Sequence, residues 1–261
     1  MGSLHVAHPR LHQADPSVLD GMQRVVFEHA GLSTSTSDDP SHPVKPWASD
    51  LTTAELASLR TNLHCQFPNL SEAVIDQALR LYLDQPTVAA ANQLAYETCE
   101  SVGYLSRERI VEQAAAAHQI PTAYLETDAE IMHQRLQPSS ASDAQSLRFA
   151  FSDAAKALVE DVVQALNHGD YDRVAALSDE SLVGAGVDAQ AFREVMVRQR
   201  NALWMTRLPA LLDEGHVFIL VGAAHLPGPD GLIARLQALG YRVSPVWLPA
   251  GSGTAAAVDG R

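Results

Sequence analysis

The chain has 261 residues, of which 46% are hydrophobic and 19% are charged. This composition supplies enough apolar side chains for a sizeable core and excludes a disordered chain. Asp and Glu number 31 against 18 Lys and Arg, which gives a formal net charge of −13. Such a chain lacks the general basic surface that binds phosphate backbones, so we expect no nucleic acid partner.

Hydrophobicity indicates neither a membrane span nor a signal sequence. The longest apolar run, 217–224, is much shorter than the roughly 20 residues that cross a bilayer, so we expect no transmembrane segment in this chain. Residues 1–5 lack the basic flank and apolar stretch of a secretory signal, and the protein as written is expected to be cytoplasmic. An α/β domain normally places a strand before the turn that these residues form, so we expect a shortened start. A signal peptide lost with that strand would make the protein periplasmic or secreted.

The first half of the chain predicts a buried strand, a loop and a helical section. A short helix is expected at 16–21, and the β-branched and aromatic run 23–27 predicts a strand that ends at Glu28. Residues 31–50 are rich in Ser, Thr, Pro and Asp and predict a loop. From 51 to 117 the apolar residues follow a helical spacing. We expect 51–117 to form a helical insertion that covers the sheet as a cap.

The second half predicts strands that alternate with helices. Strands are expected at 121–125, just before Glu126, and at 216–221 and 241–246, and helices at 128–136, 154–167, 192–212 and 232–239. The sequence therefore predicts an α/β fold, with a central mixed β-sheet formed by the N- and C-terminal segments. The whole chain, 1–261, would be a single domain whose α/β core covers 1–30 and 118–250.

A four-residue pattern, Gly-x-x-His, joins Gly2 to His5 and Gly222 to His225. A glycine three residues before each histidine lets the backbone turn tightly, so that the imidazole faces back over the edge of the sheet. Ligands of open α/β sheets bind beyond the carboxyl ends of the strands. Taken alone, each pattern is more typical of a surface or packing histidine. The Gly-x-x-His pattern occurs at expected strand ends near both termini, and this placement favours a ligand-binding site.

Four chemically active side chains are expected at the carboxyl ends of strands, namely His5, Glu28, Glu126 and His225. Two histidines and one or two carboxylates suit a divalent metal ion, which we expect to be Mn, Co or Zn. Such an ion lowers the pKa of bound water and creates a nucleophile near neutral pH. The sequence therefore predicts a metal site with His5, His225 and Glu28 as ligands, which would also be the catalytic residues.

The C-terminal segment 197–246 resembles the signature of the TraB/PrgY/GumN family. In that signature an Arg-Asn helix and an apolar strand precede Gly-x-x-His-Leu-x-Gly, a further helix and Gly-Tyr-x-Val, which correspond here to VRQRNALW, HVFILVGAAHLPG and LGYRV. GSLH and RVVFEHAG resemble the N-terminal part of the family, and IPTAYLETDAE resembles its Leu-Glu-Thr segment. Both ends and the middle of the chain therefore contribute to the resemblance.

The resemblance carries family positions over to Gly2, His5, Glu28, Glu126, Arg200, Asn201, Gly222 and His225. It implies that Arg200, Asn201 and Glu126 contact the substrate and that Gly2 and Gly222 are structural turn residues. Tiki-type membrane metallopeptidases, erythromycin esterases and ChaN-like haem-binding proteins are related to this family. The resemblance therefore implies a fold and a site geometry more firmly than one reaction.

Several of these positions have a structural alternative. Arg200 could clamp an anion or pair with a carboxylate, and Glu126 could cap the helix that follows it. His8, His12 and His29 extend the N-terminal group of histidines, and we expect them to lie outside the site.

Cys65 and Cys99 fall in expected helical segments and have no spacing typical of a metal site. Cysteines so placed are most often free buried thiols, and a disulfide between them is the less favoured alternative.

Two functions are compatible with the sequence. The first is a peptidase-like, metal-dependent hydrolase of an amide or ester bond in a peptide or small-molecule substrate. In it His5 and His225 bind the ion and Glu28 is a ligand or the general base. The alternative is a non-catalytic module of the same fold that binds a peptide signal or haem, although the 6% of aromatic residues do not indicate a haem slot. The sequence does not predict the oligomeric state.

Overall fold

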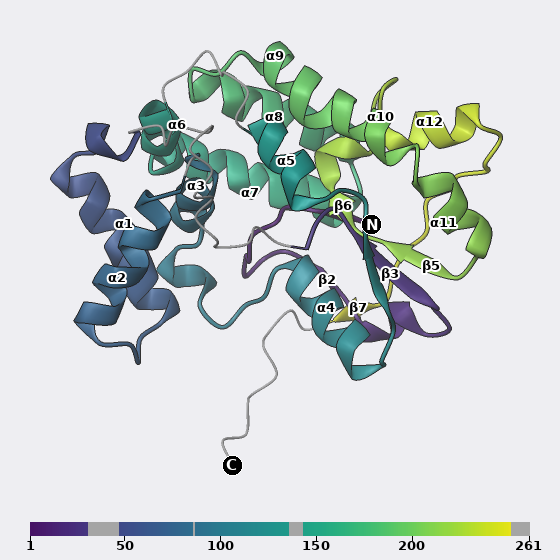
Figure 1. The fold of residues 1–261 in the computed structure, drawn as a ribbon, viewed down its shortest axis with the longest axis horizontal. Coiled ribbons are helices and arrows are strands. Elements are labelled where there is room, and N and C mark those ends of the chain that lie inside the picture. Colours follow the sequence, from purple (N-terminus) through teal and green to yellow (C-terminus); the bar gives the residue numbers. More distant parts are fainter. Residues whose placement is uncertain (31–46, 86, 136–142, 252–261) are drawn as a thin grey trace.

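The computed structural model describes residues 1–30, 47–85, 87–135 and 143–251 (Figure 1). Its strands are β1 (Gly2–Ser3), β2 (Gln13–Ala14), β3 (Arg24–Phe27), β4 (Thr122–Tyr124), β5 (Val217–Ile219), β6 (Val221–Gly222) and β7 (Ala250–Gly251). Its α-helices are α1 (Thr53–Gln66), α2 (Glu72–Leu83), α3 (Ala89–Tyr96), α4 (Arg107–Ala117), α5 (Asp128–Arg135), α6 (Asp143–Ala150), α7 (Asp153–His168), α8 (Tyr171–Gly184), α9 (Ala189–Arg193), α10 (Arg200–Trp204), α11 (Leu208–Glu214) and α12 (Leu232–Ala238). Shorter helical turns are η1 (Pro16–Leu19), η2 (Trp47–Asp50), η3 (Cys99–Ser101), η4 (Glu194–Gln199) and η5 (Ala223–His225). Of the predicted loop 31–50, residues 31–46 lie outside the described residues.

Parallel strands from both ends of the chain form the centre of the fold. β3 lies between β4 and β5, and all three strands are parallel. A single residue, Leu220, separates β6 from β5, and β6 pairs in parallel with β1 at Gly2–Ser3. β2 and β7 form a separate antiparallel pair. The predicted α/β class is confirmed, with parallel and antiparallel pairs in separate small sheets.

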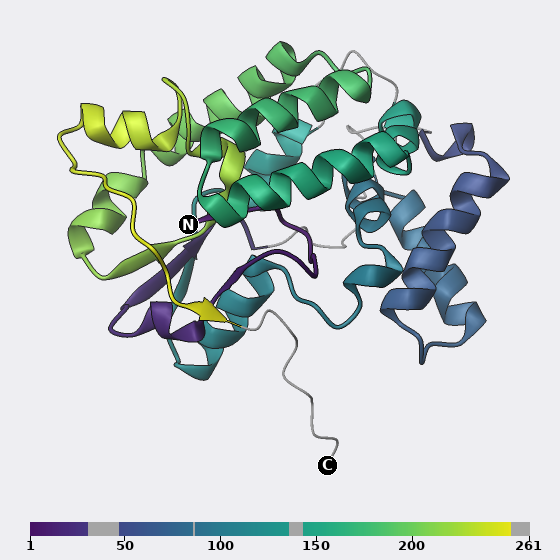
Figure 2. The ribbon, with the colours of Figure 1, turned by 180° about the vertical axis from the view of Figure 1, so that it is seen from behind.

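The predicted strand at 241–246 is wrong. Residues 241–249 belong to no strand, and they run from α12 to β7 along the outside of the molecule (Figure 2). Pro245 has no N–H to donate, and Trp247 is 86% exposed. A β-branched sequence forms a strand only where the edge of another strand is available for pairing. In this segment of the chain, pairing begins at β7, which pairs with β2.

The buried run of β3 packs on both faces of the sheet. Val25 and Phe27 lie in one apolar cluster with Val111 and Ala115 of α4. Val26 belongs to a different cluster, which contains residues of α10, α11 and α12. Successive side chains of a strand point to opposite faces, and a parallel sheet is normally covered on both. Helix α4 thus packs on the sheet, although the predicted helical insertion 51–117 includes it.

The first helices have a core of their own. Leu59 and Leu63 of α1, Ile75 of α2, Leu94 of α3 and Leu147 of α6 pack together. These helices lie to one side of the strands in Figure 1. The described part of 51–117 contributes no strand. Its role as a cap remains a prediction.

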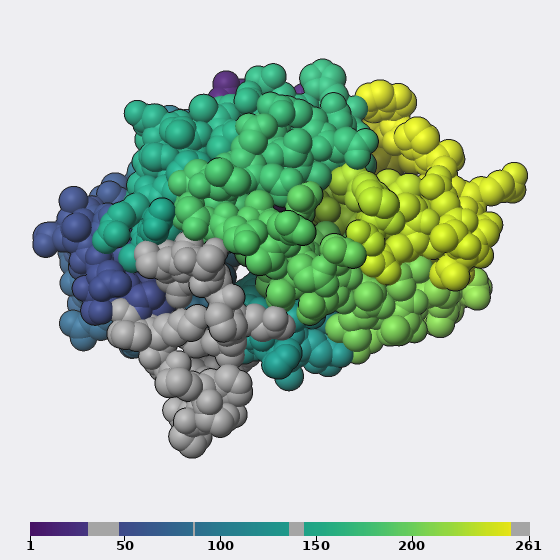
Figure 3. All heavy atoms as spheres, turned by 90° about the horizontal axis from the view of Figure 1, so that it is seen from above, coloured from purple at the N-terminus to yellow at the C-terminus, as the bar shows by residue number. Residues whose placement is uncertain are grey.

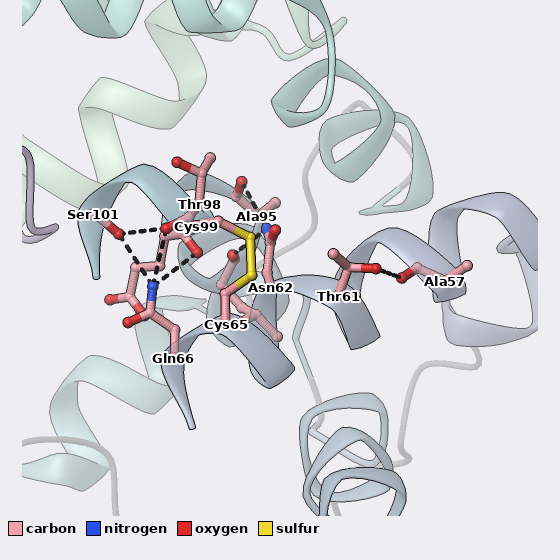
Figure 4. Close-up of a disulfide and its surroundings, with 11 residues drawn as sticks. Ala57, Thr61, Asn62, Cys65, Gln66, Ala95, Thr98, Cys99 and Ser101 are labelled. Atoms are coloured by element: carbon pink, nitrogen blue, oxygen red, sulfur yellow. Dashed lines mark hydrogen bonds between the residues drawn. A yellow bond between two sulfur atoms is a disulfide. The ribbon is translucent and has the colours of Figure 1, made fainter. Parts of the chain in front are cut away.

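A disulfide joins two parts of this helical section (Figure 4). Cys65 near the end of α1 is bonded to Cys99 in η3, so the favoured interpretation of free thiols is wrong. The fold brings the two Cα atoms to 5.1 Å, within the range that a disulfide requires. Beside it, Nε2 of Gln66 donates to the carbonyl of Thr98 and to Oγ of Ser101. The link between α3 and α4 is therefore held covalently and by hydrogen bonds.

Helices α7 and α8 lie beside the carboxyl end of β6, because α8 contacts η5 directly after that strand. α7 and α8 pack against each other and against the N-terminal segment around Leu11. Figure 3 shows the face formed by α8, α9 and α10, with α12 at one end in yellow. Within the described ranges, no helix has the length and hydrophobicity required to cross a membrane.

Candidate functional site

Side chains that follow four strands meet at the carboxyl ends of the sheet. Glu28 directly follows β3, Glu126 follows β4, His225 follows β6 and His5 follows β1. Oε1 of Glu28 lies 3.5 Å from Nε2 of His5 and 4.0 Å from Nε2 of His225. Residues from the two ends and the middle of the chain thus form one cluster.

The guanidinium of Arg200 joins the two carboxylates of the cluster. Its Nη2 donates to Oε2 of Glu28 at 2.6 Å and to Oε1 of Glu126, while its Nε donates to Oε2 of Glu126 at 3.1 Å. Its Nη1 lies 3.1 Å from Nε2 of His225. Arg200 is only 5% exposed, so these are buried charge-assisted contacts. Carboxylate pairing, one of the two alternatives for this arginine, is present in the structure.

A change of helical geometry positions the Arg-Asn pair. Helix η4 is π-helical, and α10 begins immediately after it at Arg200. π-Helical turns are rare and are often found at functional sites, because the wider turn changes the direction of the side chains that follow. Arg200, Asn201 and Trp204 are all buried here. Nε1 of Trp204 donates to Oε2 of Glu126 at 3.0 Å and completes the contacts of that carboxylate.

His225 is held as a neutral imidazole with its lone pair facing the cluster. Nδ2 of Asn201 donates to the carbonyls of His225 and Asp230, so its Oδ1 is left to accept. Nδ1 of His225 lies 2.7 Å from that Oδ1 and is therefore the protonated nitrogen, as assigned from the hydrogen-bond network. Burial lowers the pKa of His225 to about 3. Nε2 consequently carries the lone pair, which accepts a hydrogen bond from Nη1 of Arg200.

His5 lies between two carboxylates. Its backbone adopts a left-handed conformation (φ 65°), which is uncommon outside glycine, and its N–H donates to Oγ of Ser3 at 3.1 Å. Its Nδ1 is 2.9 Å from Oε1 of Glu108, and its Nε2 faces Glu28. Partial loss of hydration alone would lower the pKa of His5, but Glu108 and Glu28 raise it to about 10. The ring is 49% exposed, and it lines the cavity described below.

The two glycines of the Gly-x-x-His patterns are needed for space. A Cβ on Gly222 would lie 2.6 Å from Nε2 of His5 and 3.1 Å from Oε1 of Glu28. The N–H of Gly222 donates to that same Oε1. A Cβ on Gly2 would meet the ring of Tyr171 at 2.6 Å. Gly222 has an ordinary φ of −55°, so close approach, and not an unusual backbone conformation, requires a glycine there.

Glu28 remains ionised in this setting. Burial alone would raise the pKa of Glu28, but His5, His225 and Arg200 hold it well below its usual value. The neighbouring His29 behaves differently, because burial and the charge of Arg135 lower its pKa. The site therefore presents a carboxylate next to neutral and cationic groups at neutral pH.

Glu28 lies close enough to each imidazole to share a divalent ion with either histidine. Ligand atoms bound to one ion at roughly 2.0–2.3 Å lie about 3–4.5 Å apart. The distances from Oε1 of Glu28 to both imidazole Nε2 atoms, 3.5 and 4.0 Å, fall in this range. The opposite ring nitrogens are held by Glu108 and by Asn201, and such second contacts orient metal-ligating histidines.

A second group of donors shares the same glutamate. Ligand atoms of Glu28, His29 and Glu126 all lie within 4.8 Å of one another, so this group could also hold a metal ion. Both carboxylates are buried, and His29 is partly exposed. His29 was expected to lie outside the site, and the structure places it within this group of donors.

A cavity of about 790 Å³ opens beside the cluster. His5, Glu28 and Arg200 line it on the side of the sheet, and Tyr104 and Glu108 line it from the segment that follows the disulfide. Residues of α2 and α3 form the opposite wall. The cavity therefore lies between the sheet and the helical section, with Glu28 in its lining.

Sequence reasoning missed two residues of the site and left the role of a third open. Glu108 stands in the first turn of α4, where acidic residues are common for helix stability, so no local signal marks it. Arg135 ends α5 and likewise resembles an ordinary C-terminal cation. Glu126 does not cap α5. Thr127 does so instead, since its Oγ1 accepts from the N–H of Glu130 at 3.3 Å.

The clustered residues are those that carry the family resemblance. The sequence profile of the TraB/PrgY/gumN family matches residues 1–245 of the chain. The chain belongs to this family. No curated protein and no solved structure matches it. In this TraB/PrgY/gumN protein, both Gly-x-x-His patterns, the strand-end Glu28 and the Arg200–Asn201 pair come together at one edge of the sheet.

Proposed function

We propose that this TraB/PrgY/gumN protein is a metal-dependent hydrolase of amide or ester bonds. The observation that supports the proposal is that two imidazole Nε2 atoms face one oxygen of Glu28 at the edge of a cavity of about 790 Å³. His5, His225 and Glu28 would hold an ion such as Mn²⁺, Co²⁺ or Zn²⁺. When bound, the ion polarises a carbonyl group and lowers the pKa of coordinated water.

The residues of the chain would share the remaining steps. Glu28 takes a proton from water as the water oxygen bonds to the carbonyl carbon, and that proton is passed to the departing amine or alcohol when its bond to carbon breaks. Arg200, fixed by Glu126, adds positive charge next to the developing oxyanion. Asn201 keeps Nε2 of His225 deprotonated.

A peptide library followed by mass spectrometry tests the proposal. Purified protein is loaded with Mn²⁺, Co²⁺ or Zn²⁺, and products are followed with time. We expect metal-dependent cleavage that disappears in Glu28→Gln and in His225→Ala. His64→Ala is the matched control, because the side chain of this histidine is exposed and pairs with the exposed Glu72. Cleavage that persists in both site variants, or that needs no metal, would contradict the proposal.

A second candidate is a binding module without turnover. It is favoured by one observation, namely that Arg200 already neutralises Glu28 and Glu126 within the chain. Because the charges of the two carboxylates are already compensated by Arg200, the site can bind a peptide without a metal ion. Tight retention of peptides from the same library, with no cleavage under any metal, would favour this second candidate.

A further inference from the structure

In the described part of the chain, Arg135 is one of three arginines that line the cavity. It is the last residue of α5, and it lines the cavity together with His5, Glu28 and Arg200. Its Nε is buried and has no hydrogen-bond partner among the residues that the structure describes. A buried donor without an acceptor is costly, and the cost is removed when a ligand supplies the acceptor.

The other arginines of the cavity are already paired. Arg200 is bound to Glu28 and Glu126, and Nη1 of Arg109 donates to Glu112 at 3.0 Å. Arg135 lies near the same reactive cluster as Arg200. Burial lowers the pKa of Arg135. The charge of Arg200 lowers this pKa further, whereas the charge of Glu28 raises it. A guanidinium nevertheless stays charged at neutral pH, so an anion is its natural partner.

The rest of the lining limits which anion can enter. Four carboxylate side chains, those of Glu28, Glu97, Glu108 and Glu112, line the same cavity. They would repel a doubly charged phosphate more strongly than a singly charged carboxylate. The planar fork of a guanidinium also matches a carboxylate with two parallel hydrogen bonds.

We propose that Arg135 binds the carboxylate of the ligand that occupies this cavity. The substrate class is then a short peptide or another acyl compound with a free carboxylate, which Arg135 holds next to Glu28. Binding of the carboxylate by Arg135 does not depend on the proposed hydrolase function. Only the cleavage of the bound ligand rests on that function.

Calorimetric titration of the metal-free protein tests the proposal independently of turnover. The probes are N-acetyl-trialanine, which has a free carboxylate, and its C-terminal amide. We expect the amide to bind at least about tenfold more weakly, which is the usual scale for one lost charge-assisted hydrogen bond. Arg135→Gln should weaken binding of the acid by a similar factor and remove the preference for acid over amide.

Two further variants serve as controls. Arg173→Gln removes a cation that does not line the cavity and is paired with the exposed Glu180, and it should keep the affinity for the acid within about twofold of wild type. Arg135→Lys keeps the charge and should retain a preference for the acid even if Arg135→Gln unfolds. Circular dichroism on each variant establishes that it is folded.

Several outcomes would overturn the proposal. Equal binding of acid and amide by the wild-type protein is one, and unchanged affinity for the acid in Arg135→Gln is another. Absence of binding by the acid at millimolar concentration would also overturn it. Inorganic phosphate that displaces the acid at lower concentration than acetate does would assign the site to phosphate instead. The titrations use metal-free protein and measure binding only. A protein that binds the acid but does not cleave peptides would therefore contradict the proposed hydrolase and leave the role of Arg135 supported.

Discussion

Replacing Arg200 by Met should be among the most destabilising single changes in this protein. Arg200, Glu28 and Glu126 are 5%, 7% and 3% exposed, so the variant leaves two buried carboxylates without their shared cation. Removal of one partner from a buried ion pair typically costs about 3–5 kcal/mol. A domain is usually stable by roughly 5–15 kcal/mol, so this loss would be a large part of the total.

Urea unfolding followed by circular dichroism measures the effect. The double variant Arg200→Met with Glu126→Gln should recover about 1–3 kcal/mol of the loss, because one orphaned charge is removed and the Gln carbonyl still accepts from Trp204. Arg60→Met is the control. It breaks exposed ion pairs with Glu72 and Asp76 and should cost at most about 2 kcal/mol. A loss for Arg200→Met no larger than that of the control would refute the reasoning that this network is buried and charged.

Three further predictions concern other parts of the molecule. Reduction of the Cys65–Cys99 disulfide, whose partners are 34 residues apart, should lower the free energy of unfolding by about 3–4 kcal/mol on loop entropy alone, and an unchanged urea midpoint in dithiothreitol would contradict this. Hydrogen bonding to Arg207 lowers the pKa of Glu130 from 4.5 to about 2, so the stability that this carboxylate contributes is complete above pH 4.5 and is lost as the pH falls toward 2. Glu130→Gln should therefore destabilise the protein at pH 7 and have little effect near pH 2, as measured by urea unfolding across that range, and an equal loss at both pH values would argue against it. Gly222→Ala would place a Cβ 2.6 Å from a ring nitrogen of the site, so turnover should fall at least about tenfold at a nearly unchanged melting temperature, and wild-type turnover would count against the geometry.

Local sequence patterns predicted those strands and helices whose position depends on neighbouring residues in the sequence. The apolar residues 25–27 are buried on both faces of the sheet, and they form most of β3 at its centre. Ser152 and Gly169 mark the ends of α7, since the serine caps its first turn and the glycine adopts the left-handed conformation at its last. The positions of Glu28 and His225 at strand ends followed from the same patterns, because parallel strands end at one edge.

Only the tertiary structure decided how these groups are used. The pairing of Arg200 with Glu28 and Glu126 requires α10 to cross above the ends of β3 and β4, and a helix sequence by itself does not reveal which strands it will face. The bond between Cys65 and Cys99 likewise depends on how α1 packs against η3. The predicted strand at 241–246 failed for the same reason, because strand formation needs a neighbouring edge and propensity alone does not provide one. Contacts between residues that are distant in sequence depend on how the whole chain packs. A local sequence pattern does not contain this information.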